Sequence, residues 1–183
     1  MFKDNLLFCE KHEEVANQIV SAYQPGINII NGLVVVIFGG AGTGKSEVAW
    51  WLSRKLYCKN FSSHILGLDR FYKVPVEERE ATRKTTLEIG PNEIDFERVA
   101  DEVELFYNND HIDVLIIEGL YAGYIPISNL RVYLSGDLDS TYEFRKRRGK
   151  ENPDSDWRKF VIQKEQEAVV KSLKDGDEIY TTL

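Results

Sequence analysis

Residues 39–46 of the chain read Gly-Gly-Ala-Gly-Thr-Gly-Lys-Ser, and they directly follow the apolar run 33–38. A short apolar run that ends in glycines predicts a buried strand, and the apolar spacing over 46–56 predicts a helix behind the loop. Strand, glycine-rich loop and helix in this order form a P-loop, in which backbone N–H groups turn toward phosphate oxygens. The motif therefore favours an α/β fold and predicts binding of a nucleoside triphosphate.

Two side chains of the motif have separate expected roles. Lys45 can reach the β and γ phosphates, and the Ser46 hydroxyl can ligate Mg²⁺. The alternative is a glycine-rich turn that binds nothing. The residues that we expect at the nucleotide are Gly39, Gly40, Ala41, Gly42, Thr43, Gly44, Lys45, Ser46 and Glu47. ATP and Mg²⁺ are accordingly the expected cofactors, with ATP as the default among nucleotides.

Composition argues against several classes of protein. The net charge of −7 opposes nonspecific binding to nucleic acid, which depends on Lys and Arg neutralising phosphates. Cys9 and Cys58 have no metal-binding or disulfide spacing. The sequence has no apolar run long enough to span a membrane and no signal-peptide pattern. We therefore expect a cytoplasmic protein without a nucleic-acid or membrane partner, whose oligomeric state the sequence leaves open.

Helical and strand patterns alternate along the chain, which predicts an α/β sheet covered on both faces. We expect one P-loop domain over 1–183, with an N-terminal helical segment at 1–24. The expected helices cover 10–23, 46–56, 94–108, 139–149 and 158–174, and the expected strands cover 33–38, 64–69, 113–118, 130–134 and 178–182. A hairpin at 27–32 would add one strand before the P-loop. The long polar stretch 70–92 is predicted to be functional.

Two carboxylates are placed where ligands bind in such sheets, at the carboxyl ends of strands. Asp69 is expected to close the second strand and Glu118 the third. Phosphoryl transfer to an alcohol is helped by a carboxylate that accepts the hydroxyl proton, while Mg²⁺ takes an acidic ligand, directly or through water. Asp69 suits the first role, and Ser46, Glu118 and Asp69 are the candidate metal ligands. The alternative is that each acid caps a turn or helix.

A basic run at 145–150 precedes a polar segment in this acidic chain, and residues 145–157 resemble a mobile lid. Guanidinium groups on a lid can neutralise charge on a phosphoryl group during transfer. Helical spacing favours Arg145 and Arg148 for this role. The alternative is a solvated helix end, where basic residues suit the helix dipole.

Four features together resemble one group of enzymes. They are the P-loop, the segment Asp69-Arg70-Phe71-Tyr72, the strand end before Gly119, and the arginine-rich lid. Over about residues 33–180 the chain is similar to the uridine kinase group, with its phosphoribulokinase and pantothenate kinase relatives. The resemblance implies a P-loop NTPase fold, three α/β/α layers around a five-stranded parallel sheet in the order 2-3-1-4-5, and a catalytic base at Asp69.

The acceptor side departs from that group. Uridine kinases hold the ribose with an Asp, and Ile89 stands at that position here. The acceptor pocket must therefore use other groups. The loop residues near the expected site are Tyr72, Arg79, Arg83, Lys84, Asp95 and Tyr121. The three basic residues among them suit an acceptor that carries a phosphate or carboxylate.

The predicted function is phosphoryl transfer from ATP to a hydroxyl of a nucleoside-like, sugar or related small metabolite. A P-loop ATPase or nucleotide-regulated switch that acts on a protein partner is one alternative. A nucleoside monophosphate kinase, whose acceptor is already ionised, is another. A binding protein that lost its chemistry is a third, which the joint presence of Lys45, Ser46, Asp69 and Glu118 disfavours.

Overall fold

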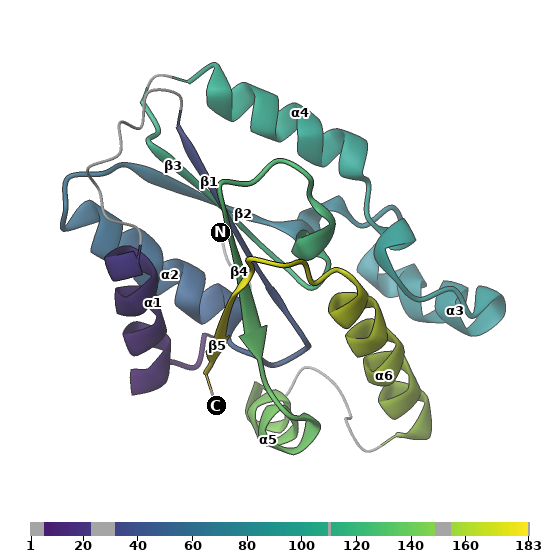
Figure 1. The fold of residues 1–183 in the computed structure, drawn as a ribbon. Coiled ribbons are helices and arrows are strands. Elements are labelled where there is room, and N and C mark those ends of the chain that lie inside the picture. The colour runs from purple at the N-terminus through teal and green to yellow at the C-terminus, as the bar shows by residue number, and fades with distance from the viewer. Residues whose placement is uncertain (1–5, 23–31, 110, 149–154, 183) are drawn as a thin grey trace.

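A computed structural model describes residues 6–22, 32–109, 111–148 and 155–182. Its centre is a sheet of parallel strands in the order β2-β3-β1-β4-β5 (Figure 1). The strands are β1 (Leu33–Gly39), β2 (Ser63–Gly67), β3 (Val114–Glu118), β4 (Leu130–Ser135) and β5 (Glu178–Thr181). This order confirms the sheet implied by the family resemblance. The expected hairpin at 27–32 lies almost wholly outside the described residues.

Helices cover both faces of the sheet. Helices α1 (Glu10–Ala22) and α2 (Lys45–Tyr57) lie on one face, and α4 (Phe96–Tyr107) and α6 (Asp156–Lys171) lie on the other (Figure 1). Residues of β1 alternate between the two cores: Val35 and Ile37 pack with α1 and α2, whereas Val34, Val36 and Phe38 pack with α4 and α6. A strand buried on both faces reads as a continuous apolar run, which is why the sequence predicted it.

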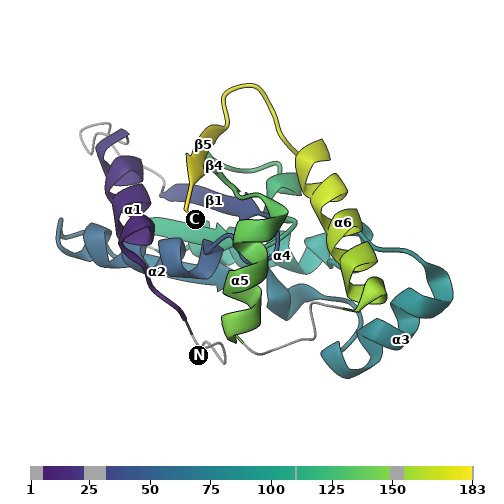
Figure 2. The same cartoon turned by 90° about the horizontal axis from the view of Figure 1, so that it is seen from below.

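The polar stretch 70–92 contains a helix that the sequence did not predict, α3 (Val76–Thr86). Helix α3 lies beside α6, away from the sheet (Figure 2). Arg83 is its one buried residue, so the helix has no apolar stripe and its sequence lacks the periodicity that reveals a helix packed on a core. Helix α5 (Leu138–Arg148) lies across the carboxyl ends of the strands (Figure 2). Within the described ranges, no helix has the length and apolar character needed to cross a bilayer.

Segments from both ends of the sequence pack against the P-loop. The Thr182 hydroxyl donates to the Thr43 carbonyl at 2.6 Å, and the Leu7 amide donates to the Glu47 carboxylate at 3.1 Å. The fully buried imidazole of His12 lies so close to Gly44 that a Cβ there would come within 2.3 Å of Nε2. The sequence predicted α1 only as a packing helix, and the structure places its first turn against the phosphate-binding loop.

Candidate functional site

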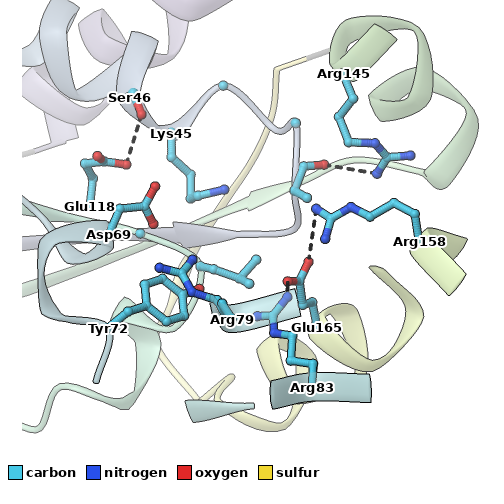
Figure 3. A pocket seen from close by; sticks show the side chains of 15 residues that line it. Lys45, Ser46, Asp69, Tyr72, Arg79, Arg83, Glu118, Arg145, Arg158 and Glu165 are labelled. Carbon is cyan, nitrogen blue, oxygen red and sulfur yellow. Dashed lines mark hydrogen bonds and ion pairs between the residues drawn. The ribbon is translucent and has the colours of Figure 1, made fainter. Parts of the chain in front are cut away.

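A pocket of about 240 Å³ opens at the carboxyl ends of the strands. The P-loop forms one side, and helices α3 and α6 contribute the opposite side (Figure 3). Its lining residues are Ala41, Gly42, Gly44, Lys45, Ser46, Asp69, Tyr72, Arg79, Arg83, Glu118, Gly119, Leu120, Arg145, Arg158 and Glu165. The pocket thus gathers P-loop residues, both predicted carboxylates and a group of arginines.

The P-loop has the conformation that anion binding requires. Gly42 and Gly44 have φ angles of +84° and +77°, a region that side-chain-bearing residues rarely adopt. Helix α2 begins at Lys45 without a side-chain cap, so its first backbone N–H groups remain open for a ligand. The Lys45 ammonium donates to the Gly40 carbonyl at 2.7 Å and lies over the loop. The arrangement can hold phosphate oxygens.

The other predicted nucleotide residues support the loop without lining the pocket. The Thr43 hydroxyl donates to the Gly40 carbonyl at 3.0 Å, which closes the loop from within. Gly39 lies against the Leu134 carbonyl, and buried Glu47 accepts the amide hydrogen bond from the N-terminal segment. Their observed contacts are structural.

Glu118 and Ser46 form a side-chain hydrogen bond next to the P-loop. The Ser46 hydroxyl donates to a Glu118 carboxylate oxygen at 3.1 Å. Glu118 ends β3, the strand between β2 and the central β1, where it pairs with Ile37 of β1 and Gly67 of β2. Burial, with the Asp69 charge nearby, raises the pKa of Glu118 to about 7, although Lys45 and the Ser46 hydrogen bond oppose the rise.

Asp69 lies two residues beyond the end of β2, in a short 3₁₀ turn over Leu68–Phe71. The sequence placed it in the strand, and this was wrong by two residues because the chain turns after Gly67. Leu68 and Phe71 of the turn are buried, whereas Asp69 lines the pocket. Since Gly67 is paired with Glu118, the turn places the two carboxylates on the same side of the pocket (Figure 3).

The donor set beside the P-loop suits Mg²⁺. Mg²⁺ prefers oxygen ligands and is commonly held by one or two carboxylates together with substrate phosphates and water. The Ser46 hydroxyl and the Glu118 and Asp69 carboxylates supply such oxygens. Burial and then the Asp69 charge raise the pKa of Glu118, and a cation beside the two carboxylates would oppose both effects. Among the described residues, no group of three or more His, Cys, Asp or Glu side chains forms a metal site by itself. The residues therefore fit a metal that arrives with a nucleotide.

On the opposite side of the pocket, Arg79 stacks on Tyr72. The guanidinium carbon lies 3.4 Å from the centroid of the Tyr72 ring, which is a close cation–π contact. Burial, followed by the charges of Glu165 and Asp69, raises the pKa of the Tyr72 phenol. The phenol is therefore neutral at physiological pH.

Arg83 is held by two carboxylates. It forms a bidentate pair with Glu93 at 2.6 and 2.8 Å, and its remaining terminal nitrogen donates to Glu165 at 3.0 Å. Arg158 lies 3.9 Å from the other Glu165 oxygen. Neither Arg158 nor Glu165 was predicted from the sequence. A sequence signal for Glu165 exists, because it is the one acidic residue among the apolar residues on the buried face of α6. A buried carboxylate requires a positively charged partner, so this position pointed to an arginine or lysine nearby.

The predicted lid is described only in part. Arg145 is buried, and its guanidinium approaches the Ala41 carbonyl at 3.4 Å and the Thr141 hydroxyl at 3.5 Å (Figure 3). It therefore lies against the P-loop. The side chain of Arg148 and residues 149–154 fall outside the described residues, so lid closure stays a prediction.

The structure places three predicted acceptor residues away from this pocket. Asp95 is the N-cap of α4, where its carboxylate accepts the Arg98 amide at 3.2 Å. Tyr121 does not line the pocket and is almost fully buried in the core, where burial and the nearby Glu165 charge raise the pKa of its phenol. Lys84 points outward and pairs with Glu80. Each is accounted for by capping, packing or a surface ion pair.

A second cavity, of about 390 Å³, lies next to the first. It is bounded by α3 and the segment 87–93, and it shares Tyr72 and Arg79 with the first pocket. These two side chains therefore stand where the cavities meet.

No protein-family model and no curated protein matches the sequence. Several solved structures match the fold. A candidate fructose transport system kinase from a Silicibacter species has a TM-score of 0.69 and 14% identity, with 92% of this chain and 98% of that chain covered. A possible uridine kinase from Bacillus stearothermophilus has a TM-score of 0.55 and 15% identity, covering 93% and 97%. The D-glycerate 3-kinase from Cryptococcus neoformans has a TM-score of 0.57 and 12% identity, covering 96% and 97%.

At these identities the likeness concerns the fold. The five-stranded parallel sheet with its flanking helices matches the fold of the uridine kinase-like P-loop kinases, as the sequence resemblance implied. The chain has the P-loop NTPase fold in the form seen in small-molecule kinases.

Proposed function

We propose that this protein is a small-molecule kinase that uses ATP and Mg²⁺ to phosphorylate a hydroxyl group. The observation that carries the proposal is that Asp69 lines the same pocket as Lys45 and Ser46 of the P-loop. A nucleotide-binding protein without an acceptor has no need of a carboxylate there. The likeness to kinase structures supports the same reading.

In the proposed reaction, the backbone amides of the P-loop and Lys45 hold the phosphates of ATP. Asp69 accepts the proton of the acceptor hydroxyl while the oxygen forms a bond to the γ-phosphorus. The bond between that phosphorus and the β,γ-bridging oxygen breaks, and ADP leaves with its electron pair. Arg145, beside the P-loop, is placed to offset charge on the phosphoryl group.

Ser46 and Glu118 would hold Mg²⁺, with Asp69 as a further oxygen ligand through water. The cation supplies charge neutralisation at the phosphates when it is bound. Glu118 must be ionised for this role, and a cation beside it favours the ionised form. We therefore expect metal binding to release a proton near neutral pH.

The test is ADP release by purified protein with Mg-ATP, alone and with a panel of sugars, sugar phosphates, hydroxy acids, nucleosides and nucleoside monophosphates. We expect one hydroxyl compound to stimulate release. Asp69→Asn should lower that rate by about 10² or more, as expected for loss of a general base.

Asp95→Asn is the matched control, because it makes the same chemical change at a helix cap where Asn serves equally well. Its rate should stay close to that of the unchanged protein. ADP release that no acceptor stimulates would overturn the proposal in favour of an ATPase or switch. Stimulation only by nucleoside monophosphates, with the Asp69→Asn rate preserved, would assign a monophosphate kinase.

A further inference from the structure

The arginines on the acceptor side of the pocket differ in what they contact. Each of the three guanidinium nitrogens of Arg83 donates a hydrogen bond to Glu93 or Glu165. Arg158 approaches Glu165 at 3.9 Å. Their charges are balanced within the protein. The basic residues that looked equivalent in the sequence are therefore not equivalent as ligands for an anion.

Arg79 is the exception among the described arginines on the acceptor side of the pocket. No carboxylate of the described ranges forms an ion pair with it, and its buried Nε has no hydrogen-bond partner there. The guanidinium lies over the Tyr72 ring, and both side chains line the pocket. A guanidinium held on a ring face keeps the N–H groups around its edge available for hydrogen bonds. Arg79 is half-buried and has N–H groups without an acceptor in the described part of the chain. Such a guanidinium can donate two parallel hydrogen bonds to a carboxylate or a phosphate.

We propose that Arg79 binds a carboxylate or phosphate group of the phosphoryl acceptor, so that the acceptor is a small hydroxylated anion. This inference rests on the proposed kinase function and names its substrate class. Asp69 lies nearer the P-loop, and Arg79 lies beyond it on the acceptor side (Figure 3). An acceptor can then place its hydroxyl at Asp69 and its anionic group at Arg79.

The size and charge of the pocket agree with such an acceptor. At about 240 Å³, the pocket is small even before a γ-phosphoryl group enters it. Asp69 and Glu118 make the P-loop side unfavourable for a second anion, whereas Arg79 gives the far side a positive charge. The two ends of the acceptor are thus distinguished electrostatically, which fixes the direction in which it binds.

A binding experiment tests Arg79 without requiring turnover. Protein saturated with Mg²⁺ and a non-hydrolysable ATP analogue is titrated calorimetrically with matched pairs: glycerate and glycerol, glycerol 3-phosphate and glycerol, and larger sugar acids and sugar phosphates with their neutral sugars. We expect at least one anion to bind about 10- to 100-fold more tightly than its neutral partner, the range of one charge-assisted bidentate contact. Whether carboxylates or phosphates show this preference distinguishes the two sources of the anion.

Arg79→Met should abolish the preference while retaining the aliphatic stem over Tyr72. Arg79→Lys should restore only part of it, because a lysine keeps the charge and loses the fork. Lys84→Met is the matched control, since it removes a nearby positive charge that faces away from the pocket and pairs with Glu80. Circular dichroism of all three variants checks that they are folded.

The outcomes separate this inference from the proposed function. Neutral members that bind as tightly as every anion, or an anion preference that survives in Arg79→Met, would overturn the role of Arg79. Transfer to neutral alcohols that is indifferent to Arg79 would overturn it while leaving the kinase proposal intact. Anion binding that depends on Arg79, without transfer to any acceptor, would support the site and overturn the kinase proposal.

Discussion

Glu118→Gln should change how the stability of the protein depends on pH. The folded structure raises the pKa of Glu118 from 4.5 to about 7 through burial and the nearby charge of Asp69. The folded state therefore binds this proton more tightly than the unfolded state does. Stability from this group is complete below pH 4.5 and is lost as the pH rises through 7. The loss amounts to about 3 kcal/mol in full, of which about 2.5 kcal/mol falls between pH 5 and pH 8.

The assay is urea denaturation of both proteins, without nucleotide or metal, across that pH range. Glutamine keeps a hydrogen-bonding group beside Ser46 and cannot ionise. All other carboxylates are present in both proteins, so the difference in the free energy of unfolding reports Glu118 together with its interaction with Asp69. We expect Glu118→Gln to gain about 2.5 kcal/mol relative to the unchanged protein as the pH rises from 5 to 8. A difference that stays flat across the range would refute the argument.

Two further substitutions test the support of the pocket and the loop. Arg83→Met should lower the free energy of unfolding by about 3 kcal/mol in urea denaturation, because the partly buried Glu93 loses its bidentate cation and the buried Glu165 keeps only Arg158, 3.9 Å away; a loss below about 1 kcal/mol would contradict this expectation. Gly44→Ala should abolish nucleotide binding in calorimetry, because the new Cβ would collide with the imidazole packed against the loop. Gly176→Ala has a similar positive φ but open space around it, so it should cost about 1 kcal/mol of stability and leave binding unchanged.

The sheet was predictable because its strands leave a direct trace in the sequence. Strands β1 and β3 are buried along their whole length and read as unbroken apolar runs. Helix α3 left no such trace, since only Arg83 of its residues is buried. Its local pattern matches a solvated loop as well as a helix. Prediction succeeded where burial on the sheet dictated residue type.

The candidate site likewise has a part that the sequence predicts and a part that only the fold reveals. The P-loop, Asp69 and Glu118 are local motifs at strand ends, so the sequence could name them before their geometry was known. The contrast between Arg79 and Arg83 depends on partners that the sequence does not place nearby, because Glu165 is 82 positions from Arg83. A list of basic residues cannot show which charges are already neutralised by the fold.

The contacts of the P-loop with distant segments have a consequence during translation. Thr182 reaches Thr43 across 139 positions, and its carbonyl accepts a contact from the Cys9 sulfur 173 positions away. A nascent chain that has emerged only as far as β4 already contains the whole glycine-rich motif, but it lacks the residue that closes the loop from the C-terminal side. Such non-local contacts form late in folding. Nucleotide binding should therefore appear only after the last strand has been synthesised. It should appear together with the pairing of β5 at the edge of the sheet.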